Sequence, residues 1–366
     1  MSDVSALKLN KRELIRQFAG ATDLQGAWHV AVTLLPLAAI GWSANRYAAQ
    51  SVFAAVALTL APALMMVRVF ALLHECGHGS VFRSKSLNTI FGFVFGVLSG
   101  MPQYVWAQHH DYHHRTNGDW DSYRGPLSTL SVAEFEALSP SAQRSYLRAR
   151  HIALAPLGGF VYLLFNPRFT WLKGTFACAL HLLRGQGLHS YKPRYWRSWR
   201  EYRHMTANNV VLLSLWALVA TQAANPWTLF AVYLIGVSIS GGFAIALFTV
   251  QHNFEQAEAN SKDRWDSDRS ALTGTSYLVL PGWLNWLTAN IGYHHVHHLS
   301  AAIPGYALAR CHEQYQHLFT SVRRIRLHEI PAHLKCLQWD IDRQQIIAVN
   351  DQQRVRQSAA FGQSAR

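Results

Sequence analysis

Three histidine clusters are the residues in this sequence best suited to chemistry: 74-HECGH-78, 109-HHDYHH-114 and 292-GYHHVHHLS-300. In the first cluster, His74 and His78 stand four residues apart. On a helix both imidazoles share one face and can reach one metal ion. Such a pair is weak evidence alone, because the chain has 20 histidines.

The second and third clusters repeat one spacing, in which three histidines occupy positions i, i+3 and i+4. These histidines are His110, His113 and His114, and then His294, His297 and His298. A histidine-rich surface loop or ordinary buried histidines would not explain the repetition. We therefore predict that the clusters bind metal. His252, in 249-TVQHNFE-255 at the end of an apolar run, is predicted as a ninth ligand.

Two histidines next to these patterns leave an alternative open. His109 precedes the second pattern and His295 lies inside the third. Either could replace a neighbouring ligand, which would shift the ligand set by one position. The remaining histidines are interpreted as ordinary.

The number of ligands indicates two metal ions, since a structural zinc takes four ligands and a catalytic zinc typically three. Imidazole suits zinc, copper, iron and nickel, so ligand type does not choose among them. An all-imidazole shell adds no negative charge, and nearby acids could orient the ring N–H groups. The candidates for this role are Glu75, Asp111, Asp119, Asp121 and Glu255. The alternative interpretation of each is an ordinary acidic residue on the solvated surface.

The elements that position the clusters are membrane helices. The chain of 366 residues is 50% hydrophobic and 14% charged, against about 25% charged in a soluble domain. A crossing needs about 20 apolar residues, which predicts four transmembrane helices at roughly 25–43, 51–73, 207–224 and 227–251. The predicted fold is an all-α integral membrane protein with two helical hairpins and a cytosolic cap.

The loop charges predict the orientation of these helices. Arg46 is the one Lys or Arg between the paired helices, while most of the others lie in the N-terminal, middle and C-terminal segments. Both hairpins therefore start and end in the cytosol, by the positive-inside rule. We predict an inner or cytoplasmic membrane location with the site facing the cytosol. The net charge of +13 is assigned to topology and anionic lipid, which excludes nucleic acid as the partner.

Two further apolar regions, 87–105 and 152–183, are predicted as re-entrant or interfacial helices. If 87–105 crossed the membrane, the second histidine cluster would lie opposite the first. The region 152–183 is interrupted by 166-NPR-168 and is expected to form two short pieces. Residues 276–293 are predicted to be interfacial. The whole chain, 1–366, is one predicted domain with a core at roughly 25–315 and a cytosolic tail at 316–366.

A dimetal site that opens between helices toward a bilayer points to a lipid substrate, since polar groups at a membrane boundary are costly and usually functional. The sequence resembles the membrane-bound fatty acid desaturases, whose three boxes here read 74-HECGH-78, 110-HDYHH-114 and 294-HHVHH-298. The tail HHLSAAIPGYAL is similar to that of bacterial, cyanobacterial and plastid Δ12 (omega-6) acyl-lipid desaturases. The resemblance covers roughly residues 25 to 315.

The resemblance implies a non-haem di-iron centre that uses O₂ and introduces a cis double bond into a fatty acyl chain, of Δ12 type on an oleoyl chain. It maps the eight box histidines onto the family's iron ligands and His252 onto its extra histidine. The substrate would be a lipid-linked or thioester acyl chain. Electrons would come from a separate ferredoxin or cytochrome b5, since the sequence has no HPGG motif of a fused cytochrome domain.

Rival functions remain at this point. A related di-iron hydroxylase, ketolase, epoxidase or acetylenase would use the same site on a lipid. A transporter is disfavoured because the predicted spans lack Asp and Glu. A hydrolytic zinc site is disfavoured because the pattern contains no carboxylate ligand. Double-bond position, chain length and head group depend on the shape of a cavity, which motif spacing does not set.

Overall fold

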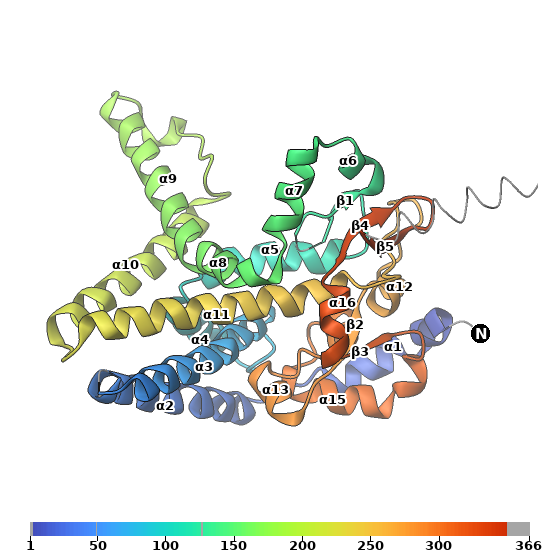
Figure 1. Cartoon of the computed structure of the whole chain (residues 1–366), viewed down its shortest axis with the longest axis horizontal. Coiled ribbons are helices and arrows are strands. Elements are labelled where there is room, and N and C mark those ends of the chain that lie inside the picture. The colour runs from blue at the N-terminus through green and yellow to red at the C-terminus, as the bar shows by residue number, and fades with distance from the viewer. Residues whose placement is uncertain (1–2, 49, 126, 350–366) are drawn as a thin grey trace, which may run out of the picture.

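A computed structural model describes residues 3–48, 50–125 and 127–349, and it is built mainly of helices (Figure 1). The N-terminal half contains α1 (Asp3–Phe18), α2 (Asp23–Tyr47), α3 (Val52–His78), α4 (Lys85–Ser99), α5 (Gln103–Thr116), α6 (Val132–Glu136) and α7 (Pro140–Ala149). The middle of the chain forms α8 (Ala155–Phe160), a π-helical turn (Val161–Phe165), α9 (Asn166–Leu183), α10 (Trp199–Gln222) and α11 (Pro226–His252). Short helices follow: α12 (Ser267–Thr273), α13 (Gly282–Leu287), α14 (His294–Leu299), α15 (Gly305–Gln314) and α16 (Ile330–His333).

Five helical segments among the described residues are long and apolar enough to cross a membrane. Four of them, α2, α3, α10 and α11, contain to within two residues the four spans that the sequence predicts, so the prediction of an all-α membrane fold is confirmed. The fifth runs from Ile152 to Leu183. The interruption at 166-NPR-168 predicts two short pieces here, but Pro167 lies in the first turn of α9, where its missing N–H costs nothing, and the π-helical turn joins α8 to α9.

The hairpin of α2 and α3 begins and ends at recognisable caps. Thr22 and Ser51 accept backbone N–H groups at the first turns of α2 and α3. Gly79 ends α3 with a φ of 70°, a left-handed conformation that glycine adopts without strain. The chain therefore turns away directly after His78, which leaves the first histidine cluster at the open end of the helix.

Helices α4 and α5 bend by 101° at the break between them. Gly100, with a φ of 80°, caps α4, and Pro102 precedes α5. Because of this bend the second cluster returns to the end of α3, as the re-entrant prediction for 87–105 required. The ring centroids of His74 and His110 lie 4.6 Å apart.

Helix α11 crosses the centre of the bundle and packs on α3 and α8. Its contact with α8 is close because glycines meet there. A Cβ on Gly159 would lie 2.5 Å from the backbone nitrogen of Gly242, so both backbones need a residue without a side chain. This close approach places α8 and the π-helical turn against the middle of α11.

The cap holds the strands β1 (Leu130–Ser131), β2 (Ser276–Val279), β3 (Arg323–Arg326), β4 (Cys336–Asp340) and β5 (Gln345–Ala348). β2 pairs with β3 and β1 with β4, both in parallel, and β4 pairs with β5 in antiparallel. Helix α1 packs on the cap through Leu7 and Leu14, which are fully buried against α14 and α15. The described part of the predicted C-terminal tail, up to residue 349, is therefore folded onto the cap.

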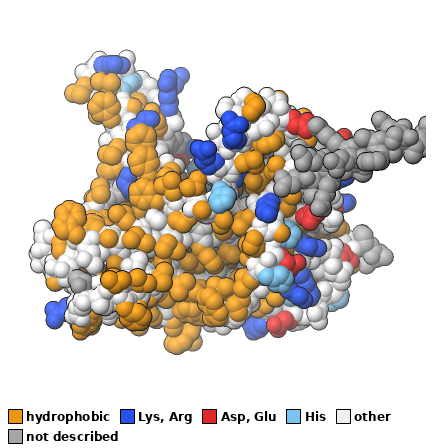
Figure 2. Space-filling model, in the orientation of Figure 1, with side chains coloured by type: hydrophobic (Ala, Val, Ile, Leu, Met, Phe, Trp, Pro, Cys, Tyr) orange, Lys and Arg blue, Asp and Glu red, His pale blue; other side chains and the backbone are white. Residues whose placement is uncertain are grey.

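The surface of the helical bundle differs in composition from the surface of the cap (Figure 2). Apolar side chains cover the helical bundle, and the acidic side chains in this view gather over the cap. Phe53 and Trp227, near the far ends of the two hairpins, are 84% and 83% exposed. Such exposure of large apolar side chains fits a lipid environment. Residues 276–293, predicted to be interfacial, form β2 and α13 and leave Trp283 and Trp286 exposed.

Candidate metal centre

Four short helical segments bring the histidine clusters together at one end of the bundle. The last turn of α3 carries the first cluster, α5 the second, and the six-residue helix α14 the third. His252 is the last residue of α11. On α5 and α14 the spacing i, i+3, i+4 aligns three imidazoles of each cluster along one face, as expected for helices.

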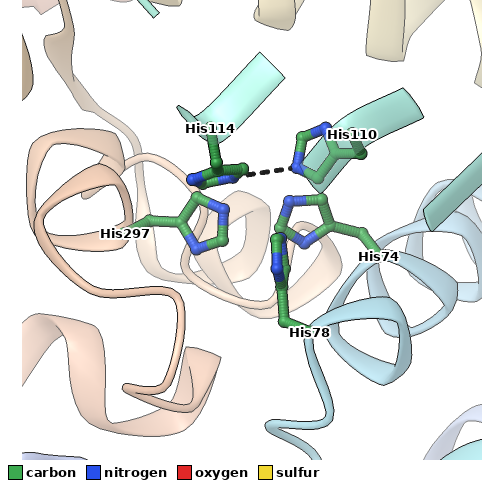
Figure 3. A group of neighbouring side chains, drawn as sticks. All are labelled: His74, His78, His110, His114 and His297. Atoms are coloured by element: carbon green, nitrogen blue, oxygen red, sulfur yellow. Dashed lines mark hydrogen bonds between the residues drawn. The ribbon is translucent and has the colours of Figure 1, made fainter. Parts of the chain in front are cut away.

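All nine histidines predicted as ligands lie in two groups. In the first group, drawn in Figure 3, five rings from three elements face a common centre: His74, His78, His110, His114 and His297. The second group consists of His113, His252, His294 and His298. Within each group the available ring nitrogens lie within 4.8 Å of one another.

The ring nitrogens face each other rather than proton-donating partners. Nε2 of His114 lies 3.1 Å from Nε2 of His110, and Nε2 of His294 lies 2.8 Å from Nε2 of His252. Several other buried ring nitrogens have no hydrogen-bond partner among the described residues, on His78, His113, His252, His294 and His297. Unpaired buried polar atoms are costly. Ions placed among the facing Nε2 atoms would satisfy those nitrogens, so the donor set fits two ions bound by imidazole. The Nδ1 atoms of His113, His252 and His294 lie on the other side of their rings and cannot bind the same ion.

Burial keeps the cap histidines in the form that binds metal. Burial lowers the pKa of His294, His297 and His298 well below the ordinary value, and the neighbouring histidines lower it further. A neutral imidazole offers a lone pair, whereas an imidazolium does not. The third cluster is therefore neutral and ready to coordinate at neutral pH.

One of the five candidate acids contacts a clustered histidine. Oε1 of the buried Glu75 lies 3.1 Å from Nδ1 of His74, and Oε2 accepts hydrogen bonds from the backbone N–H of Gly305 and the hydroxyl of Ser80. A carboxylate only accepts, so Nδ1 of His74 carries the proton and Nε2 is left to face the group. The contact with Gly305 ties the first cluster to the segment after the third.

The other four acids make different contacts. Asp111 is exposed and pairs with Arg115 at 3.2 Å. Asp119 is buried and accepts two backbone N–H groups in its own turn, from Asp121 and Ser122. Asp121 accepts the backbone N–H of Lys262, and Glu255 is exposed.

His109 and His295 lie outside both groups. His109 is exposed on α5, at the edge of a cavity. His295 is fully buried but faces the opposite way from the clustered rings of α14, and its Nε2 lies 2.8 Å from Nδ1 of His312. The structure therefore brings together the nine predicted histidines and places neither His109 nor His295 in a neighbour's position.

A cavity of about 470 Å³ adjoins the histidine groups. His74, His110, His113 and His294 form one part of its wall, and most other lining side chains are apolar or aromatic, among them Val67, Phe70, Trp106, Tyr162, Leu247 and Phe248. The cavity lies between α3, α5, α8 and α11. Its volume is in the range of small-molecule sites, and its lining suits a long apolar chain held beside the metal groups.

Arg68, a fully buried charge within the second span, is not among the residues that the sequence patterns predict for the site. Its Nε donates to the hydroxyl of Thr33 at 2.8 Å, and Nη2 lies 2.7 Å from Nδ1 of His29. The guanidinium also donates to the carbonyl of Trp286 and lies 4.1 Å from that indole ring. Arg68 thus links two spans to α13. The sequence does contain a signal for this residue, because a lone arginine within an apolar run is costly in a membrane and is usually functional.

Comparison with known proteins supports one family. The family model described as "Fatty acid desaturase" matches residues 49–328. A fatty acid desaturase of Bacillus subtilis (strain 168) is 31% identical over 323 residues, which cover 86% of this chain and 83% of that protein. An sn-1 oleoyl-lipid 12-desaturase of Anabaena variabilis is 22% identical over 301 residues, covering 80% and 72%. A chloroplastic omega-6 fatty acid desaturase of Arabidopsis thaliana is 23% identical over 262 residues, covering 68% and 50%.

Proposed function

The chain belongs to the fatty acid desaturase family and is an oxidoreductase, and we propose that it introduces a cis double bond into an oleoyl chain, of the Δ12 or omega-6 type. The observation that carries this proposal is the position of nine imidazoles, in two groups, beside an apolar cavity. The printed names of the cyanobacterial and plastid relatives support the position of the double bond.

The nine histidines would hold two non-haem irons, five in the first group and four in the second. Bound iron would supply the oxidising power to remove hydrogen from an unactivated C–H bond with O₂. In the overall reaction two adjacent methylenes lose two hydrogens, and O₂ takes up these hydrogens with two electrons and two protons to give two waters. No acid or base in the chain is needed to break a C–H bond.

The residues of the cavity position the acyl chain and exclude water. Trp106, Tyr162 and Phe248 line the space next to His110 and His113. Rings packed around a methylene chain hold its reacting carbons near the metal groups, and orientation of this kind is a large part of catalysis. Water kept out of the cavity would also protect the reactive centre.

Glu75 is the positioning residue that we propose for the first group, because it fixes the tautomer of His74. Of the other acids predicted for this role, Asp119 would act indirectly, by holding the turn that follows α5. Asp111, Asp121 and Glu255 would act through solvent or the cap surface.

Partners and location follow from the same proposal. The substrate is a lipid-linked or thioester acyl chain, and the electrons come from a separate ferredoxin or cytochrome b5. The protein lies in the inner or cytoplasmic membrane with the histidine groups at its cytosolic face. The scarcity of Lys and Arg between the paired helices supports this orientation.

The test is fatty-acid methyl-ester profiling of a bacterial host that makes oleate but no diene, with and without this chain. A new diene supports the proposal, and its double-bond position reports the regiochemistry. The His298→Ala variant, expressed to the same level, is the control and should give no diene. A hydroxy or alkynyl product would instead assign the related hydroxylase or acetylenase chemistry.

A further inference from the structure

Helix α9 projects from the helical bundle as an arm and returns through residues 184–198 to the start of α10 (Figure 1). Nothing in the proposed reaction uses this arm. Its two faces differ in what they contact.

One face of α9 packs on the first half of α10. Arg168 donates to the side-chain carbonyl of Asn209, Trp171 Nε1 donates to the hydroxyl of Thr206, and the hydroxyls of Thr175 and Tyr202 lie 3.0 Å apart. The partners move backward along α10 as they move forward along α9, so the two helices run antiparallel. Arg168 also donates to the carbonyls of Leu163 and Leu164, which fixes the base of the arm to the cavity wall.

The opposite face of α9 exposes a continuous apolar stripe. Its members recur at intervals of three and four residues, which places them on one side of a helix: Phe165, Phe169, Leu172, Phe176, Ala179 and Leu183. Phe176 is 71% exposed and Leu183 is 84% exposed. Among the described residues nothing covers this stripe. A continuous exposed apolar surface of this kind marks a contact with a partner or a membrane.

The exposed charges on the segment that carries the stripe are of one sign, and the neighbouring Glu201 is buried. Residues 137–200 contain no Asp or Glu and ten basic residues, Arg144, Arg148, Arg150, Arg168, Lys173, Arg184, Lys192, Arg194, Arg197 and Arg200. Lys173 lies beside the stripe, with its ammonium 4.7 Å from the ring of Phe169. Lys192, Arg194 and Arg197 are exposed on the segment that leads back to α10. Aromatic rings stand between them, and Trp196 packs on Tyr202.

We propose that α9 and the basic segment 192–200 form a binding surface for anionic phospholipids, with the apolar stripe in the outer hydrocarbon and the Lys and Arg side chains on the headgroup phosphates. An apolar helix face bordered by basic and aromatic residues is the pattern of an interfacial membrane helix. This surface serves lipid contact rather than oxidation, so it goes beyond the proposed function.

Charge favours lipid over the other occupants. A second copy of the chain would bring another arm of the same positive sign, which opposes association. A crossing by Ile152–Leu183 would separate Arg148 and Arg150 from Arg184 by a bilayer, against the positive-inside rule. An arm that lies along the surface keeps both basic ends at the same headgroup layer.

The experiment measures lipid contact directly and needs neither iron nor product. A fluorophore is attached to Phe176→Cys in the full chain, where the four native cysteines are buried. The protein is placed in vesicles of phosphatidylcholine and phosphatidylglycerol, with brominated acyl chains on one lipid or the other. We expect quenching by brominated phosphatidylglycerol to exceed quenching by brominated phosphatidylcholine at least about threefold at equal mole fraction.

Two variants with equal loss of charge test the site. Lys192→Gln/Arg194→Gln should remove most of the preference for phosphatidylglycerol, while Arg323→Gln/Arg326→Gln, exposed on β3 in the cap, should keep it. A label at Glu313→Cys in the cap should not be quenched. Equal quenching by both lipids, equal loss from both double variants, or energy transfer between labelled copies without quenching would each overturn the proposal.

Discussion

The two histidine groups differ in whether a carboxylate contacts one of their rings. In the first group a buried carboxylate, that of Glu75, contacts His74 and the backbone of Gly305. In the second group no carboxylate contacts a ring among the described residues, and Nδ1 of His113, His252 and His294 is buried without a partner. Phe248 packs there instead, with its ring centroid 4.9 Å from that of His113 and 5.0 Å from that of His252. The groups therefore differ at one ring: a carboxylate orients His74 in the first group, whereas in the second group packing on Phe248 takes that place.

The largest effect is expected when a ring is removed from either group. His110→Ala and His298→Ala should each lower product formation by about 10³-fold or more, since a catalytic metal that loses a ligand loses its geometry. Membrane insertion should be unchanged. Methyl-ester profiling with immunoblotting of membranes measures both, and His189→Ala, an exposed histidine outside the groups, serves as the control. An active His298→Ala enzyme would refute the ligand assignment.

A smaller effect is expected from the carboxylate that distinguishes the first group. Glu75→Gln keeps the size of the side chain but loses its charge and part of its accepting capacity, and should lower metal affinity or activity about 10- to 100-fold. Asp111→Asn, which alters an exposed pair with Arg115, should change activity less than about twofold. Iron titration of both variants measures the difference. Equal effects would mean that Glu75 does not position His74.

The packing of the second group predicts a third effect. Phe248→Leu shortens the side chain between His113 and His252, and a displacement of about 1 Å at a reacting centre costs up to about 10²-fold. We expect roughly tenfold lower activity, with iron lost from the second group before the first. Iron per chain after a timed chelator challenge tests this order. Retention of both irons, with activity unchanged, would contradict it.

The smallest effect concerns a buried histidine outside both groups. Burial and, to a smaller extent, the positive charge of Arg324 lower the pKa of His312 to about 4. The unfolded chain takes up this proton below about pH 6.5, whereas the folded chain does not until about pH 4. Stability therefore falls as pH falls between these values, by about 1–2 kcal/mol from this residue at pH 5.

A His312→Asn variant should remove this part of the dependence, while the buried histidines of α14 keep theirs, and iron content at neutral pH should stay the same. Melting temperatures of both proteins at about pH 7 and pH 5 measure the slope. A variant as sensitive to acid as the parent would show that His312 is not the group that titrates.

The parts of the fold and site that sequence could predict are those that depend on local pattern. Apolar runs gave α2, α3, α10 and α11, and the spacing of the boxes placed three rings on one face of α5 and of α14. The rings come together only because α4 and α5 bend by 101° at the break between them. The sequence indicated such a bend indirectly, since a full crossing would have put the first and second clusters on opposite sides of the membrane.

The parts that sequence could not predict depend on contacts between distant segments. The partition into groups of five and four takes His113 from one box and joins it to His252 and His298. Arg68 is satisfied by Thr33, His29 and Trp286, which are far from it in the chain. The pairing of β4 with β1 is likewise long-range. Residue spacing and hydrophobic periodicity do not predict these contacts, because each contact depends on how the helices pack.

The central claim is that the nine histidines form a two-iron centre. The most direct measurement is the metal content of the full chain, expressed with iron supplied, purified in mild detergent and analysed by mass spectrometry of the elements. The account predicts two irons per chain, and fewer in His110→Ala and His298→Ala. A protein without iron, or one whose iron content is unchanged in both variants, would contradict it.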